Sequence, residues 1–294
     1  MSDKPVITQA MIDAYDEYTH LTLDRRGFME KLTKLAGSGA AAAVIAPLIG
    51  AREAQAAKVA PDDNRLRGED VPWPGEMGEM SGYLVRPADA SGKLPGVIVI
   101  HENRGLNEHI RDVARRMALE GFMAFAPDFL SAVGGTPEDS DKAREMISQL
   151  EPTDTVANAM AAAAFLAARD DSTGATGAIG FCWGGGLVNS LSAAAPESLK
   201  AGVAYYGRQV PASAVPGIKA SLLLHYAGLD ERINAGIEDY RKALEAAGKD
   251  VTIHVYDGVN HAFNNDTSAA RYDEKAAALA WERTVAFLKE KLTA

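Results

Sequence analysis

The chain has a single cysteine and no excess of basic residues. The first shortage excludes an intramolecular disulfide, and the second argues against nucleic-acid binding. Of its 294 residues only Cys182 is a cysteine, so no intramolecular disulfide can form. Thirty lysines and arginines face 40 acidic residues, for a formal net charge of −10. A chain without a basic face is not expected to bind nucleic acid. The lone thiol is compatible with reducing and oxidising compartments alike, because it has no partner to pair with.

The sequence also lacks an apolar run long enough for a stable membrane span. The candidate at residues 35–50 is rich in alanine and glycine and is short of the ~20 residues that a spanning helix needs. It follows the pair Arg25-Arg26 and precedes Ala54-Gln55-Ala56, a small-x-small pattern of the kind that signal peptidase cuts. This order resembles a twin-arginine export signal.

We therefore predict that residues 1–56 are an export signal, not a folded domain, and that it is cleaved after Ala56. The expected partners during export are the twin-arginine machinery and signal peptidase, with no stable membrane insertion afterwards. The product would be periplasmic or otherwise exported by a bacterium. The alternatives are an amphipathic helix that begins the fold and an uncleaved anchor.

After residue 79, short β-branched runs alternate with helical patterns. Residues 96–100 (Gly-Val-Ile-Val-Ile) are typical of a strand buried on both faces. Comparable runs recur with helical segments between them, at residues 122–126, 175–179, 201–206, 220–226 and 251–256. The alternation predicts an α/β fold, with a mainly parallel sheet and helices on both faces. We expect one domain over residues 80–294, preceded by an extended segment at 57–79.

Glycines flank the single cysteine in Gly180-Phe181-Cys182-Trp183-Gly184, between a predicted strand and a predicted helix. Glycine, any residue, nucleophile, any residue, glycine at such a junction is the nucleophile elbow of α/β-hydrolases. The turn is too sharp for a β-carbon at the flanking positions, and the nucleophile stands clear of the sheet on a strained backbone. The alternative is a small buried hydrophobic residue.

An acid and a histidine follow later strands in the order of a catalytic triad. Asp230 follows one predicted strand, and His261 lies in the loop after the next. Nucleophile, acid, histidine is the chain order of α/β-hydrolases. Cys182 would attack a carbonyl as thiolate, His261 would carry the proton, and Asp230 would hold the imidazole tautomer. Asp230 could instead cap the following helix.

Two backbone N–H groups are candidates for an oxyanion hole. Trp183 follows the nucleophile and Asn103 follows the early strand, the two places from which such donors come. The pair His101-Glu102 has no accompanying metal-ligand spacing in the sequence. We therefore predict neither a metal site nor a cofactor. Of the other histidines, His20 is assigned to the export signal.

Three motifs together resemble the dienelactone hydrolase (carboxymethylenebutenolidase) family. They are His101-Glu102-Asn103-Arg104-Gly105-Leu106-Asn107, the elbow with Gly185, and Asn260-His261-Ala262-Phe263. The resemblance covers residues 80–292. It implies a single-domain α/β-hydrolase fold without a large lid, a Cys-Asp-His triad and no cofactor. It also implies hydrolysis of an ester or enol-lactone in the breakdown of aromatic compounds.

The resemblance gives Glu102 a role beside the cysteine. In the family this glutamate influences when the thiol becomes a thiolate. A nearby carboxylate favours the neutral thiol, whereas an imidazolium favours the thiolate. The alternative for Glu102 is a surface glutamate at a strand end.

One position departs from the family pattern. Four residues beyond the histidine, where members bind the substrate carboxylate with arginine, this chain has Asn265. Arg104 or Arg208 could replace that arginine, because bidentate guanidinium is the natural clamp for a carboxylate. Substrate-binding roles are also expected for Tyr205, Tyr206 and Phe263, although Tyr205, like Trp183, could be a core aromatic residue.

The leading hypothesis is a cysteine-dependent hydrolase that cleaves a small lactone or ester, as a monomer or small homo-oligomer. A second is a broader carboxylesterase or thioesterase with the same triad. A third is a non-catalytic binding protein on the same fold, since fold does not fix function. A missing triad member would favour the third, and none is missing.

Overall fold

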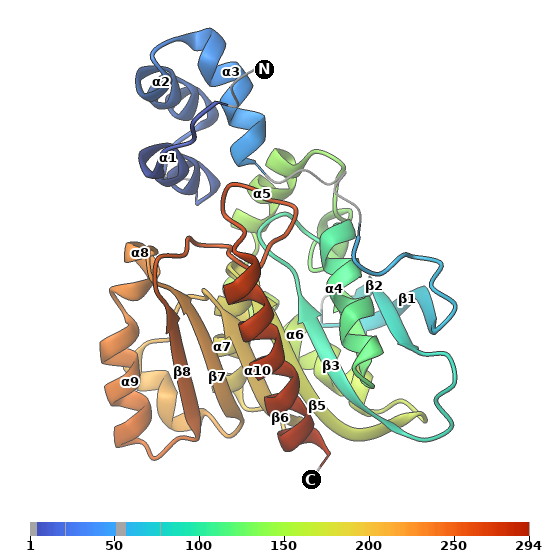
Figure 1. The fold of residues 1–294 in the computed structure, drawn as a ribbon. Coiled ribbons are helices and arrows are strands. Elements are labelled where there is room, and N and C mark those ends of the chain that lie inside the picture. The colour runs from blue at the N-terminus through green and yellow to red at the C-terminus, as the bar shows by residue number, and fades with distance from the viewer. Residues whose placement is uncertain (1–4, 21, 51–56, 77, 294) are drawn as a thin grey trace.

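One eight-stranded sheet organises the computed structural model, which describes residues 5–20, 22–50, 57–76 and 78–293. The strands lie in the order β1-β2-β4-β3-β5-β6-β7-β8 (Figure 1). Their bounds are β1 Leu66–Gly75, β2 Gly78–Pro87, β3 Leu94–Ile100, β4 Met123–Pro127, β5 Ser172–Phe181, β6 Leu199–Tyr205, β7 Ser221–Ala227 and β8 Val251–Tyr256.

The sheet is parallel from β4 to β8, whereas β1 and β2 are antiparallel additions at one edge. This confirms the predicted α/β sheet. The β-branched run in β3 is buried on both faces from Pro95 onward, as a central parallel strand requires. The segment at 57–79 differs from the prediction, because it supplies β1 and so extends the sheet before residue 80.

Helices cover both faces of the sheet, as predicted. Apolar side chains of α4 and α10 pack on one face, and those of α6, α7 and α9 pack on the other (Figure 1). The bounds of the helices are α1 Gln9–Thr19, α2 Arg25–Ala36, α3 Gly39–Ile49, α4 Glu108–Leu119, α5 Ser140–Ser148, α6 Pro152–Ala167, α7 Trp183–Ala194, α8 Glu231–Asn234, α9 Ile237–Ala246 and α10 Glu274–Leu292.

Side-chain caps begin several of these helices. Asn107 accepts a hydrogen bond from the Ile110 N–H at the start of α4, and Asp273 accepts one from Ala276 at the start of α10. Helix α7 has no such side-chain cap and begins at Trp183, directly after the cysteine. Three glycines in a row, which are poor helix formers, therefore lie within its first turn.

The strand order creates a crevice at the carboxyl ends of β3 and β5. From β3 the chain moves to β4 on one side, and it later returns to β5 on the other side of β3. Open α/β sheets bind their ligands at such a switch in strand order. Glu102 follows β3 and Cys182 follows β5, so both reach this crevice.

The N-terminal helices α1 to α3 form a small unit with its own apolar core, near α5 and α8 (Figure 1). Tyr18 stacks on Phe28 with ring centroids 5.0 Å apart, and Leu32 is fully buried. Residues 5–20 and 22–50 therefore fold, contrary to the expectation of a leader without a fold of its own. The expected cleavage motif at residues 54–56 lies outside the described residues.

No single described helix is both long and apolar enough to cross a membrane. Helices α2 and α3 meet the length and composition requirements only as a pair, and they are bent by 112° at the break between them.

Candidate active site

Cys182 occupies a strained turn between β5 and α7. Its φ of 54° and ψ of −113° are unfavourable for a residue with a side chain. A β-carbon on Gly184 would lie 2.5 Å from the His101 carbonyl oxygen, and one on Gly180 would collide with the Gly184 carbonyl. The two glycines therefore let α7 start against the end of β3, as the elbow motif predicts.

His261 and Asp230 form a buried hydrogen-bonded pair. His261 Nδ1 lies 2.5 Å from Asp230 Oδ2, and the residues are 2% and 5% exposed. The other carboxylate oxygen accepts from the Ile233 N–H at 3.2 Å. Asp230 thus holds the imidazole and caps α8 at once, so the two roles left open by the sequence coexist.

The electrostatics of the pair favour charged forms. Burial alone would raise the pKa of Asp230, but the His261 imidazolium and Arg232 hold it below its ordinary value. Burial alone would lower the pKa of His261, but the charges of Cys182 and Asp230 raise it well above 6.5. The imidazolium is therefore stabilised beside the thiol.

Glu102 is buried beside this cluster and is held by Asn265. The Asn265 amide donates to Glu102 Oε2 at 2.7 Å, while its carbonyl oxygen accepts from the Thr267 hydroxyl at 2.6 Å. Asn265 thus has a partner on each side and fixes the orientation of Glu102. Its place in the family pattern did not indicate this contact.

Arg271 is a buried cation that the sequence analysis missed. It is 7% exposed, and its guanidinium donates to Asp16 of α1 at 3.2 Å. Burial would lower its pKa, but the neighbouring side chains of Tyr15, Asp16, Glu102 and Cys182 raise it. No local pattern around Arg271 marks it, since only the fold brings it to the site.

His20, at the end of α1, lies directly over Cys182. Its Nε2 is 3.6 Å from Cys182 Sγ, and its ring meets that of His261 edge-on with centroids 4.9 Å apart. Burial, followed by the charges of His261 and Arg232, lowers the pKa of His20 to about 2. His20 was not among the predicted site residues, because residues 1–56 were assigned to an export signal.

Further polar contacts hold α1 over the crevice. The Asn103 amide donates to the Thr19 carbonyl at 2.7 Å. Arg104 donates to the Tyr15 hydroxyl at 2.7 Å and to Ser140 at 2.6 Å. Arg144 donates to the Tyr18 carbonyl at 2.8 Å. Arg104 is therefore engaged by α1 and α5 and does not line the cavity beside the thiol.

A cavity of about 580 Å³ lies beside Cys182 and His261. Two of the predicted substrate-binding residues line it, Tyr206 and Arg208. Of the other three, Arg104 does not line the cavity, and Tyr205 and Phe263 are fully buried core residues, which corrects the prediction. The Tyr205 hydroxyl lies 2.7 Å from Thr284 Oγ1. The cavity is also lined by Thr19, His20, Asn103, Arg144, Trp183, Gln209 and Arg232.

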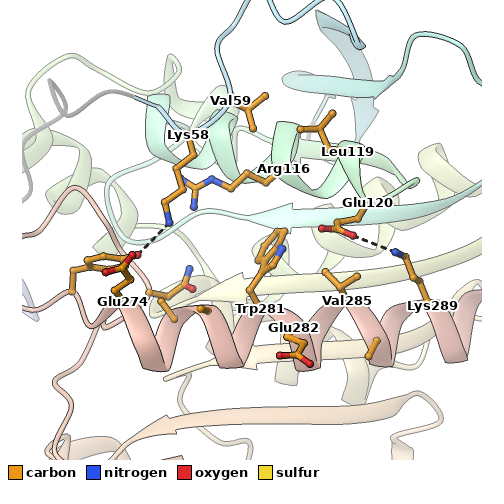
Figure 2. Close-up of a pocket in the computed structure, with 15 residues that line it drawn as sticks. Lys58, Val59, Arg116, Leu119, Glu120, Glu274, Trp281, Glu282, Val285 and Lys289 are labelled. Atoms are coloured by element: carbon orange, nitrogen blue, oxygen red, sulfur yellow. Dashed lines mark hydrogen bonds and ion pairs between the residues drawn. The ribbon is translucent and has the colours of Figure 1, made fainter.

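A second hollow of about 790 Å³ lies between α4 and α10 (Figure 2). Trp281 forms part of its wall, and the Lys289–Glu120 ion pair at 3.2 Å crosses it (Figure 2). None of the triad residues lines it. The predicted site residues Cys182 and His261 therefore line the smaller cavity and not this one.

The remaining expected residues take clear positions. His101 is fully buried and stacks on Trp183 with centroids 5.2 Å apart, so it supports the elbow. Trp183 begins α7 and also lines the cavity. Cys182, His20 and His261 present one potential ligand atom each within 4.8 Å of one another, a grouping that no sequence spacing indicated.

Comparisons with known proteins agree with this architecture. The dienelactone hydrolase family model matches residues 80–292. An Escherichia coli O157:H7 protein provisionally named carboxymethylenebutenolidase is 32% identical over 245 residues, covering 78% of this chain and 89% of that protein. A Klebsiella pneumoniae crystal structure provisionally described as a dienelactone hydrolase is 33% identical, with a TM-score of 0.70. It covers 76% of this chain and 98% of that one.

We expect Gly184→Ala to lower kcat/KM for ester hydrolysis by at least about a hundredfold, because displacements near 1 Å can cost this much. The added methyl group would press on the Ile100 and His101 carbonyls and push the start of α7, with Cys182, out of place. Steady-state kinetics on a small aryl ester would measure the loss. Gly92→Ala is the matched control, because a β-carbon there meets nothing within 4 Å. Equal rates for both variants would contradict the tight-elbow argument.

Proposed function

The chain belongs to the dienelactone hydrolase family of carboxylic ester hydrolases with the α/β-hydrolase fold, and from this premise we propose that it cleaves a small enol-lactone or ester through Cys182, His261 and Asp230. The observation that carries the proposal is the His261–Asp230 pair beside a cysteine at a strained elbow. The cluster favours the Asp230 carboxylate and the His261 imidazolium, and an imidazolium beside the thiol supports nucleophilic attack by the thiolate.

The reaction divides into acylation and deacylation. The Cys182 thiolate attacks the carbonyl carbon, and collapse of the tetrahedral adduct breaks the acyl C–O bond. The His261 imidazolium gives its proton to the departing oxygen, which leaves a thioester on Cys182. Water then attacks the thioester with His261 as base, and the carboxylic acid leaves as the thiol is restored.

The start of α7 supports an oxyanion hole. The Trp183 N–H belongs to the first turn, where helical N–H groups have no intrahelical partner. We assign it, with the Asn103 N–H, to the developing negative charge on the carbonyl oxygen. Tyr206 adds a further donor, because burial, followed by the charges of Glu102 and Cys182, raises the pKa of its phenol well above 10.

The cavity is consistent with a small acyl group, and its lining does not single out one particular substrate. Arg208 is exposed at its wall and can meet a carboxylate, whereas Asn265 is engaged with Glu102. The second candidate, a broader carboxylesterase or thioesterase, is favoured by this use of Asn265. A role in the breakdown of aromatic compounds would apply if dienelactone is preferred.

We predict cysteine-dependent hydrolysis of dienelactone or of a neutral aryl ester. Cys182→Ala should lower kcat/KM by at least about a thousandfold, because it removes the nucleophile. Asp230→Asn should lower it by about a hundred- to ten-thousand-fold, because it no longer holds the tautomer of His261. Initial rates of the full chain and of the exported product would be compared on both substrates.

The exposed Asp257→Asn, in the turn after β8, is the control for the aspartate change. A preference for dienelactone would support carboxylate recognition, and cleavage without preference would support the broader esterase. A Cys182→Ala variant as active as the parent would eliminate the proposed mechanism.

We also propose that Glu102 restrains thiol ionisation until substrate binds. Glu102→Gln keeps the shape of the side chain and a carbonyl oxygen for Asn265 but removes the charge. We expect alkylation of Cys182 by iodoacetamide to become several-fold faster at neutral pH, since the thiolate is the reacting form. Unchanged alkylation and turnover across the pH range would show that Glu102 has no such role.

Export of the protein remains our proposal for residues 1–56. The side chains of Arg25 and Arg26 are 81% and 87% exposed at the start of α2, so an export receptor can reach them. In a bacterium with the twin-arginine machinery, the parent should accumulate in the periplasm with Ala57 as its first residue. A variant with both arginines changed to lysine should remain in the cytoplasm.

Cell fractionation and N-terminal sequencing would measure this, with Lys34→Arg as the charge-conserving control. Periplasmic accumulation of the double variant would refute the export signal. Recovery of the parent with residues 1–56 intact would refute the cleavage.

A further inference from the structure

Three donor atoms converge beside the elbow from two distant parts of the chain. Cys182 Sγ and one ring nitrogen from each of His20 and His261 lie within 4.8 Å of one another. A sulfur and two imidazoles are ligands of Zn²⁺, as in sites with three protein ligands and one open position. We propose that the full chain binds Zn²⁺ between Cys182, His20 and His261.

Both imidazoles are held in the tautomer that a metal requires. His20 Nδ1 lies 2.7 Å from the Asp16 carbonyl oxygen, which can only accept, so this nitrogen carries the proton. Arg232 Nη2, which can only donate, lies 2.8 Å from Nε2, so Nε2 carries a lone pair. Metal-binding histidines are typically fixed in this way, with the second nitrogen bonded to a carbonyl or carboxylate.

His261 has the same arrangement with a carboxylate. Its Nδ1 is bonded to Asp230, and its buried Nε2 has no hydrogen-bond partner within the described part of the chain. An unpartnered nitrogen in a residue only 2% exposed faces the sulfur and the second imidazole. Binding of Zn²⁺ would displace the Nε2 proton of the imidazolium form to solvent and satisfy this nitrogen.

The spacing of the donors matches a tetrahedral ion. A Zn²⁺ ion with ordinary bonds of ~2.3 Å to sulfur and ~2.1 Å to nitrogen separates these two ligands by about 3.6 Å. His20 Nε2 and Cys182 Sγ are 3.6 Å apart. The donor atom of His261 already lies within 4.8 Å of both, and the fourth position opens to the cavity, where water can bind.

The charges around the site set a competition with Arg232. The Asp230 and Glu102 carboxylates and the thiolate favour a divalent cation, whereas Arg271 and Arg232 oppose it. Arg232 also uses the lone pair that Zn²⁺ needs, but this side chain is on the exposed start of α8. The Arg232 side chain can move into solvent, whereas the imidazoles of His20 and His261 are held by the Asp16 carbonyl and the Asp230 carboxylate.

Bound zinc would block the chemistry and fasten the N-terminal unit. It would occupy both the sulfur and the nitrogen that hydrolysis uses, and it would link α1 to the elbow. The blocking effect rests on the proposed roles of Cys182 and His261. Binding itself does not, so a spectroscopic test separates the two.

The test is titration of the metal-free full chain with Co²⁺, followed by competition with Zn²⁺. Co²⁺ reports a thiolate ligand through a sulfur-to-metal charge-transfer band. We expect one equivalent to bind with this band and Zn²⁺ to displace it. Zn²⁺ should also inhibit ester hydrolysis, and a chelator should reverse the inhibition.

Variants assign the ligands. His20→Gln retains an acceptor for Arg232 but not the imidazole, and it should weaken Zn²⁺ binding at least about tenfold, since loss of an outer partner alone costs 10–100-fold. His254→Gln, on β8 away from the triad, is the matched control and should bind as the parent does. Arg232→Ala should bind more tightly, because its competing donor is gone.

Absence of the charge-transfer band in the parent would overturn the proposal. Equal affinity in His20→Gln and the parent would also overturn it, because Zn²⁺ would then bind without α1. Zinc binding in a chain with no cysteine-dependent hydrolysis would support the site and contradict the proposed function instead.

Discussion

The close approach of α7 to the end of β3 is the constraint on which the site depends. Gly184 lies against the carbonyls of Ile100 and His101, and no other residue leaves room for this contact. Cys182 stands beside this contact on a strained backbone, and Glu102, two residues after β3, reaches the same crevice. The grouping of the proposed triad residues follows, because β7 and β8 continue the parallel sheet and deliver Asp230 and His261 at the same end.

Sequence reasoning succeeded where local patterns carry the information. The β-branched run of β3 is such a pattern, and the strand that it predicts is present in the structure. The chain order of Cys182, Asp230 and His261 predicts a triad, which stays a prediction, and the structure brings Asp230 and His261 into hydrogen-bond contact. Tyr205 was wrongly predicted to bind substrate. A central parallel strand is covered by helices on both faces, so its sequence pattern does not distinguish a core residue from one that lines a pocket. Local sequence patterns do not indicate Arg271 or the contact between Asn265 and Glu102, since only long-range packing brings Arg271 and Asn265 to Glu102.

The N-terminal segment shows a different limit. An arginine pair, a small-residue apolar run and a cleavage pattern describe how a segment is recognised, and they do not exclude helices that pack. Helix α1 carries polar side chains as well as Tyr15 and Tyr18, and these two aromatics bury among α2 and α3. The segment predicted to be an export signal therefore also carries His20, which lies over Cys182. No sequence motif predicted this position.

The way in which this unit is attached indicates that it can separate. Its apolar core is its own, formed by α1 to α3, with Ala270 packing against it from the sheet domain. Its described contacts over the crevice are mainly hydrogen bonds, from Asn103, Arg104, Arg144 and Arg271. Polar interfaces of this kind are typical of parts that move relative to one another. Water can replace the acceptors that α1 offers these side chains once the crevice is open, so release need not leave buried charges without partners. The N-terminal unit is thus held over Cys182 by polar groups and one imidazole, and it is not part of the apolar core of the sheet domain.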